Sequence, residues 1–204
     1  MSTSTYHGWL AAALLSLAAT TSLAAEEAPV APSGAPDAAA MEAWARMAAA
    51  GPQHEQLKYF EGTWDEASHF VMAPGAEPTT AKGTSVAKAI LGGRYIETVH
   101  NGDFMGQPHE GRGLAGYDNQ MGHYTQVWID NASTALYTAT GSYDAASKSY
   151  TFKGSMSDPM QPGTTMPVRN VIRIESPDQY TFEWYDTHDG KEVKSMWIVY
   201  TRRK

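Results

Sequence analysis

A tryptophan and a carboxylate two positions apart, Trp128 and Asp130, are the first side chains in this sequence that could together bind a small molecule. Tyr124 and Gln126 have the same parity, so in a strand all four side chains lie on one face. If that face lines a cavity, the indole can stack on a ligand and the carboxylate can accept a hydrogen bond. The alternative is that Asp130 and Asn131 simply start a turn.

A second candidate is Glu183, which we expect on the inner face of a late strand together with Tyr185. Beside an apolar neighbour such as Met196, desolvation raises the pKa of an inward carboxyl, which suits a general acid or a ligand anchor. In a cofactor-free isomerase or hydrolase, Glu183 would transfer the proton, and Tyr185 or Asp130 would stabilise the oxyanion or orient the substrate. The alternative is an ion pair between Glu183 and its diagonal neighbour Lys194.

No spacing in the chain matches a catalytic or metal-binding signature. The histidines never occur at i, i+2 on a strand or at i, i+4 on a helix, so we expect no metal. His100 and His109 flank a loop and could meet across that hairpin, although solvated loop histidines are more common. There is no G-x-S-x-G elbow, no P-loop and no complete dinucleotide-binding fingerprint. We therefore expect no catalytic residues and no cofactor.

The segments that must position these residues are short, alternating stretches that begin at Gly62-Thr63-Trp64. Turn residues separate them, most clearly at Asp189-Gly190, the dipeptide of a type I' hairpin. A meandering sheet without helices removes its unpaired edges by closing on itself. The sequence predicts an all-β fold, a single up-and-down antiparallel barrel of about ten strands, approximately at residues 63–72, 79–90, 94–104, 111–118, 123–130, 135–143, 149–156, 167–175, 180–187 and 191–202.

The turns also predict the register of the last three strands. If Asp189-Gly190 and Pro177-Asp178 are two-residue loops, Glu183 pairs with Met196 on one side and with Ile172 on the other. Paired residues point to the same face, and this face is mostly apolar with a few separated polar groups, as in a ligand pocket. We expect it inward, so the predicted ligand-binding residues are Trp128, Asp130, Asn170, Glu183, Tyr185, Met196 and Tyr200.

The opposite face of these strands combines arginines with aromatic rings: Arg169, Arg173, Phe182, Trp184 and Trp197. We expect this face outward, where a guanidinium can lie over a ring and shield it from water. The competing assignment turns the two arginines inward as clamps for a carboxylate.

Residues 1–24 have the pattern of a signal peptide. The apolar run at residues 9–19 is too short to span a bilayer, and Ser22 and Ala24 are the small residues that a signal peptidase recognises. Residues 1–8 contain no Lys or Arg, so a membrane anchor is the alternative. Cleavage after Ala24 predicts an exported protein, periplasmic or extracellular, without stable membrane insertion.

The next segments differ in composition from the strands. Residues 25–37 are rich in proline and alanine and are expected to form a flexible tether. Residues 38–60 favour two short helices, of which the second brings Leu57 and Phe60 to one end of the barrel. Residues 61–204 form the predicted barrel domain.

Charge and cysteine content exclude several partners and cross-links. The formal net charge is -7, and basic residues cluster only at the terminal Arg202-Arg203-Lys204. Such a surface repels phosphate groups, so we expect neither nucleic acid nor an anionic membrane as a partner. The chain contains no cysteine, which excludes disulfides and a lipidated N-terminal cysteine.

Several short motifs along the chain are those of one bacterial family: Gly62-Thr63-Trp64, Leu91-Gly92-Gly93-Arg94-Tyr95, Gly116-Tyr117-Asp118-Asn119, Trp128-Ile129-Asp130, Phe182-Glu183-Trp184-Tyr185 and Tyr200-Thr201-Arg202. Through them, residues 52–203 resemble the family called domain of unknown function 1579. The resemblance implies a lipocalin-like barrel and no established activity. In the wider lipocalin pattern, an arginine from a late strand covers the G-x-W tryptophan, and these structural roles would fall to Trp64 and to Arg202 or Arg203, with Arg202 favoured by its parity.

These observations predict an exported barrel that binds a small, largely hydrophobic molecule, with the acid–base enzyme as the alternative. Some ten-stranded barrels that resemble this one hold an iron porphyrin through a histidine on a late strand. Here the last three strands contain no interior histidine, because His188 lies in the final hairpin turn, so haem is not expected.

Overall fold

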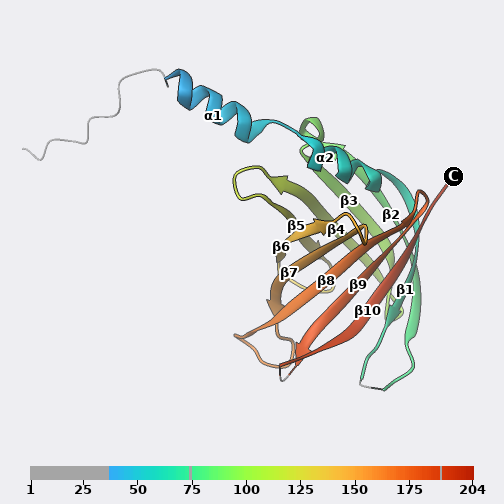
Figure 1. Ribbon diagram of the computed structural model, residues 1–204. Coiled ribbons are helices and arrows are strands. Elements are labelled where there is room, and N and C mark those ends of the chain that lie inside the picture. Colours follow the sequence, from blue (N-terminus) through green and yellow to red (C-terminus); the bar gives the residue numbers. More distant parts are fainter. Residues whose placement is uncertain (1–36, 74, 189) are drawn as a thin grey trace, which may run out of the picture. The chain divides into compact units, whose positions relative to one another are not determined.

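The computed structural model describes residues 37–73, 75–188 and 190–204 (Figure 1). The predicted signal peptide at residues 1–24 lies outside the described residues, and so does the predicted tether at residues 25–37, apart from Asp37. Within the described part, no helix is both long enough and apolar enough to cross a membrane.

Ten antiparallel strands form one closed barrel, which confirms the predicted fold class (Figure 1). Each strand pairs with the next along the chain, and β1 closes the ring by pairing with β10. A closed ring leaves no strand edge unpaired. The strands are β1 Gly62–Phe70, β2 Thr79–Ile90, β3 Tyr95–Phe104, β4 Gln107–Asp118, β5 His123–Asp130, β6 Tyr137–Asp144, β7 Ser149–Ser157, β8 Thr165–Ser176, β9 Gln179–His188 and β10 Lys191–Arg202.

Short helices precede the barrel, and one helical turn interrupts it: α1 Ala38–Ala48, α2 Pro52–Leu57, η1 Lys58–Phe60 and η2 Leu91–Gly93. The carboxylate of Asp37 caps α1 by accepting from Ala40 N at 2.7 Å. No residue of α1 is buried. The C-terminal end of this helix is held by side chains of the barrel. Asn119 Nδ2 donates to two carbonyls of its last turn and to the carbonyl of Ala49, the residue after it, and Arg94 Nε donates to Ala48 O at 2.7 Å.

One end of the barrel is closed by Trp64 and the residues before it. Trp64 is fully buried and donates its indole N–H to Phe60 O at 2.8 Å. Arg202 Cζ lies 4.1 Å from the centre of the Trp64 ring, which is the arrangement that the lipocalin pattern implies. Its guanidinium donates to Glu61 O and to Tyr59 O at 2.6 and 2.8 Å. A cation on an indole face, with its N–H groups bound to backbone, locks this end.

The register of the last three strands was predicted wrongly because two irregularities were not foreseen. Both loops have the expected two residues. The pairing then shifts between Ile174 and Ser176 in β8 and between Lys194 and Met196 in β10. An extra residue in one strand of a pair shifts the pairing by one position. The side chains of the partner strand then point to the opposite face of the sheet from the predicted one.

These irregularities turn over β9 and also the part of β10 before Met196, where Lys194 pairs with Tyr185 on the outer wall and not on the inner face where it was expected. The inner face of β9 consists of Tyr180, Phe182, Trp184 and Asp186, which pair with inner residues of β8 and β10. The other inner residues of β8 and β10 are the predicted ones, among them Asn170, Ile172, Met196, Ile198 and Tyr200.

Aromatic rings fill the half of the barrel beneath the helices. Tyr150 lies 5.0 Å from Tyr124 and 5.7 Å from Phe60, measured between ring centres. Burial raises the pKa of Tyr124 to about 12, which keeps this phenol neutral, and its hydroxyl donates to Gln56 Oε1 at 2.8 Å. The aromatic rings are thus densely packed at this end of the barrel.

Candidate functional site

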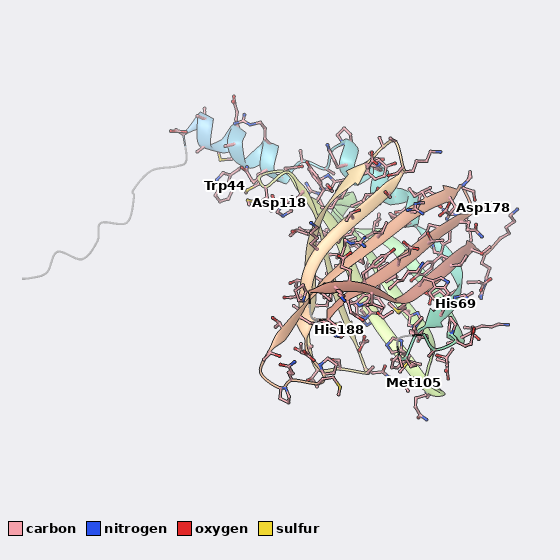
Figure 2. All side chains as sticks on the ribbon, turned by 60° about the horizontal axis from the view of Figure 1, so that its bottom comes forward. Trp44, His69, Met105, Asp118, Asp178 and His188 are labelled. Carbon is pink, nitrogen blue, oxygen red and sulfur yellow. The ribbon has the colours of Figure 1, made fainter. Side chains whose placement is uncertain are left out.

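Two tryptophans on the inner wall each donate their indole N–H to the carboxylate two residues further along the strand. Trp128 Nε1 lies 2.8 Å from Asp130 Oδ2, and Trp184 Nε1 lies 2.6 Å from Asp186 Oδ1. These pairs belong to β5 and β9 in the half of the barrel away from α2. In Figure 2, Met105 and His188 mark that end, and Asp118 and Asp178 mark the end near the helices. Asp130 is thus the last residue of β5, and its carboxylate accepts from Trp128. The same carboxylate also accepts from Ala132 N in the following turn.

Glycines of β4 make room for the Trp128 ring. A Cβ on Gly111 would lie 2.1 Å from the indole, and one on Gly113 would lie 3.2 Å from it. The ring therefore lies flat against the neighbouring strand, with its edge directed at Asp130. The sequence Gly111-Arg112-Gly113, which does not belong to a nucleotide-binding fingerprint, has this packing role.

Two histidines and two carboxylates form a continuous polar chain beside Trp128. His100 Nδ1 lies 2.7 Å from Glu66 Oε2, and His100 Nε2 lies 3.2 Å from His109 Nδ1. At the other end, His109 Nε2 lies 3.6 Å from Asp130 Oδ2. The two histidines thus meet across the β3–β4 hairpin, the arrangement that the sequence left as an open alternative to solvated loop residues.

The inner end of this chain is deeply buried. Only 1% of the Glu66 side chain is exposed, and its contact with His100 is close but poorly aligned for a hydrogen bond, so both carboxylate oxygens are without a hydrogen-bond partner. Gly83 leaves the space for the pair, because a Cβ there would lie 2.8 Å from His100 Cε1 and 2.9 Å from Glu66 Oε2. The hydroxyl of Ser85, also buried, has no hydrogen-bond partner either.

Across the barrel interior, Asn170 provides another polar group among apolar ones. It is fully buried and donates from Nδ2 to Tyr137 OH at 2.9 Å, while its Oδ1 has no hydrogen-bond partner. The Tyr137 ring packs 4.8 Å from that of Trp184, and Met196 pairs with Trp184 on the same inner face. Burial raises the pKa of Tyr137, so its hydroxyl stays protonated at neutral pH.

Tyr200 is on the inner face but lies at the closed end. Its ring stacks on Tyr180 with 4.2 Å between centres, and burial raises the pKa of its hydroxyl well above the usual value. It is therefore separated from the half of the barrel where Trp128, Trp184 and Met196 lie.

Glu183 and Tyr185 lie on the outer wall, not on the inner face where they were expected. Tyr185 OH donates to Glu183 Oε2 at 2.8 Å, and Lys194 Nζ donates to Glu183 Oε1 at 3.0 Å. Desolvation raises the pKa of Glu183, but these two hydrogen bonds outweigh it, so the pKa is lowered and not raised as expected. Arg169 covers the Tyr185 ring at 3.9 Å, in place of the predicted contacts with Phe182 and Trp184.

Two open hollows of about 600 and 640 Å³ lie along the wall of the barrel. The first is bounded by β1, β2, β3 and β10, and its lining includes Glu66 and Gly83 next to outer residues such as Lys82 and Arg203. The second crosses β5 to β8 and is lined mostly by outer residues, among them four threonines and Lys153. Neither contains the inner tryptophans.

Sequence reasoning missed Trp184, Asp186, Glu66 and the linkage of the histidines. One signal was present: the pattern Trp-x-Asp occurs both at Trp128 and at Trp184, and both copies form the same indole–carboxylate hydrogen bond. No comparable pattern marks Glu66, because its partner is a residue of β3 brought near by strand pairing.

The fold and this inner wall define the class of the protein, an up-and-down ten-stranded barrel with one end closed by helices and an arginine-covered tryptophan. The chain belongs to the family described as "Protein of unknown function (DUF1579)", whose model matches residues 49–202. A search of curated proteins finds no match.

Two solved structures are similar to the chain. The crystal structure of Rv2717c from M. tuberculosis aligns with a TM-score of 0.57 at 14% identity, covering 76% of this chain and 100% of that one. A redesigned beta barrel, b11L5F_LGL, aligns with a TM-score of 0.36 at 14% identity, covering 78% of this chain and 96% of the other. At this identity, the likeness to Rv2717c supports the fold alone.

Proposed function

We propose that the protein is an exported barrel that binds a small, largely apolar molecule in the half of the barrel away from α2. The observation that supports this most directly is a buried polar atom without a hydrogen-bond partner, Asn170 Oδ1, on a wall of aromatic and aliphatic side chains. A buried polar atom left unpaired is costly, and a ligand hydroxyl or amide would satisfy it.

The neighbouring side chains suit an apolar ligand with few polar groups. Trp128, Trp184 and Met196 are half-buried on the inner face, so their rings and thioether are available to a guest. The carboxylates of Asp130 and Asp186 are already bound to indole N–H groups, which orients the rings and leaves oxygen lone pairs for a ligand donor. Pockets for small molecules have this composition of apolar walls and a few fixed polar groups.

Native mass spectrometry of the protein purified from its own cells tests the proposal. We expect a second mass beyond that of the polypeptide, and a rise in the melting temperature when that compound is added back. Recovery of the bare mass, with no thermal shift across fatty acids, isoprenoids, flavins and haem, would contradict it.

A matched pair of variants tests where the molecule binds. Ile198→Trp adds bulk to the inner face of β10, whereas Val199→Trp adds the same ring to the outer face of that strand. We expect the first variant to lose the bound compound and the second to retain it. The reverse result would move the site to the outer hollow that Val199 lines.

Export is part of the proposal and has its own test. The pattern of residues 1–24 supports cleavage after Ala24. The mass of the protein from its own cells should then correspond to a chain that begins at Ala25, and the protein should be found outside the cytoplasm. A full-length mass in the membrane fraction would support the anchor instead.

Glu183 does not suit the acid–base alternative. Its carboxylate lies on the outer wall in an ion pair with Lys194, and its pKa is lowered, so it has neither the position nor the protonation state of a general acid in an apolar pocket.

A further inference from the structure

We propose that His100 and His109 together bind one divalent transition-metal ion, of the copper or zinc class, on the inner wall of the barrel. The site lies between β3 and β4, and neither the family nor the proposed apolar ligand implies it. The inference does not rest on the proposed function, because the ion would bind with or without a guest.

The separation of the two ligand atoms fits a shared ion. His100 Nε2 and His109 Nδ1 are 3.2 Å apart. Two imidazole nitrogens bound to one tetrahedral ion at about 2.0–2.1 Å lie roughly 3.3 Å from each other. The rings need only a small reorientation to direct both lone pairs at one point, and their planes already differ by 59°.

The outer nitrogens of both rings face carboxylates. His100 Nδ1 lies 2.7 Å from Glu66 Oε2, and His109 Nε2 lies 3.6 Å from Asp130 Oδ2. Histidines that bind metals commonly donate their second N–H to a carboxylate, which fixes the tautomer and strengthens the ligand. The indole N–H of Trp128 in turn holds Asp130 at 2.8 Å.

Charge balance also favours an ion. With metal, each ring keeps one proton on its outer nitrogen and offers a lone pair on its inner one. The two charges of the ion then equal those of the two carboxylates, for which the described part of the chain provides no Lys or Arg partner.

The remaining coordination positions are left to solvent or to a guest. Within the described residues, no three His, Asp or Glu side chains converge as metal ligands, so the protein provides two. Gly83 and Gly102 clear the space around His100, since a Cβ on either would lie within 3.0 Å of its ring. The buried hydroxyl of Ser85, which has no hydrogen-bond partner, lies on the adjoining strand β2 opposite His100 and can accept from metal-bound water.

Titration of the metal-free full chain with Cu²⁺ or Zn²⁺ by calorimetry tests the site. We expect one ion per chain, with binding lost in the variant His100→Ala/His109→Ala and unchanged in His123→Ala, a histidine of β5 at the other end of that strand. Glu66→Gln, which keeps the size of the side chain, should weaken binding by about 10- to 100-fold.

Electron paramagnetic resonance of the Cu²⁺-loaded wild-type chain decides the ligands even if the double variant does not fold. We expect superhyperfine splitting from two imidazole nitrogens. Absence of binding to the wild type would overturn the proposal, leaving the histidines as a hydrogen-bonded pair. Equal binding by the folded double variant, or a spectrum without imidazole nitrogen, would overturn it as well. None of these outcomes depends on the apolar ligand.

Discussion

The inner carboxylates and the outer carboxylate of this barrel differ because of their neighbours. Glu66 lies among buried side chains with one histidine beside it, whereas Glu183 lies on the outer wall with a tyrosine hydroxyl and a lysine as donors. Charged groups with two hydrogen-bond donors at the surface are stabilised in their ionised form. Chemistry that needs a carboxyl with a raised pKa is therefore not expected at Glu183.

Glu183→Gln should leave ligand retention unchanged and lower the free energy of unfolding at about pH 7 by less than about 1 kcal/mol, as for exposed ion pairs. The folded-state pKa of Glu183 is lowered below its unfolded value, so its contribution is complete above the unfolded pKa and is lost as the pH falls through the folded pKa. Urea unfolding at about pH 7 and about pH 3.5 should show a smaller acid-induced loss in the variant. An equal loss in both proteins, or a loss of bound compound, would contradict the outer position.

Gly111→Ala should displace the Trp128 ring, because the new Cβ would lie 2.1 Å from it. Forcing a side chain out of a packed site costs about 1–3 kcal/mol. Gly113→Ala is the matched control, since its Cβ would be 3.2 Å from the same ring. Tryptophan fluorescence and urea unfolding should both change more in the first variant, and equal effects would show that Trp128 does not lie flat on β4.

At the scale of strands, the positions of the strands along the sequence could be predicted. The face of the sheet to which the side chains of β9 point could not. The turn residues predicted all ten strands and both two-residue loops. The irregularities near Glu175 and Ser195 have no glycine or proline signal, because they arise from how adjacent strands fit around the ring. The alternation within β9 was the better guide: its aromatic positions Tyr180, Phe182 and Trp184 all point inward.

The same reasoning explains which parts of the site were predictable. The inward position of Trp128 was predicted because its strand ends at a recognisable turn. The approach of Glu66 to His100 could not be found, since it depends on the stagger between β1, β2 and β3 and on the absence of a side chain at Gly83. The space that a glycine leaves for a side chain of a neighbouring strand can be recognised only when the pairing of the strands is known.

Trp64→Ala should destabilise the barrel by about 3–5 kcal/mol, the usual cost of removing a large aromatic side chain from a core. Its ring is fully buried and also supports Arg202. Trp197→Ala is the control, because that ring lies on the outer wall, stacked on His69 at 4.6 Å. Urea unfolding measures both, and a loss below about 1 kcal/mol for Trp64→Ala would contradict its place in the barrel floor.

At the scale of the molecule, the closed ring makes β10 indispensable and α1 dispensable. β10 pairs with both β1 and β9, so its removal exposes two edges at once. The helix α1 buries no side chain and contacts the barrel through its terminal carbonyls, which Asn119 and Arg94 bind. The tolerance of the chain to truncation should follow burial and hydrogen bonding, not distance from a terminus.

A chain that begins at Gly51 should therefore fold to the same barrel and unfold in one cooperative transition, with a free energy of unfolding within about 1–2 kcal/mol of the full chain. A chain that ends at Gly190 should instead aggregate, because β1 and β9 are left with unpaired backbone groups and the inner aromatics are open to solvent. Size-exclusion chromatography and urea unfolding distinguish the two. If the chain that ends at Gly190 were monomeric and unfolded cooperatively, closure by β10 would not be what holds the sheet together. If the chain that begins at Gly51 failed to fold, α1 would have a role beyond its contacts with Asn119 and Arg94.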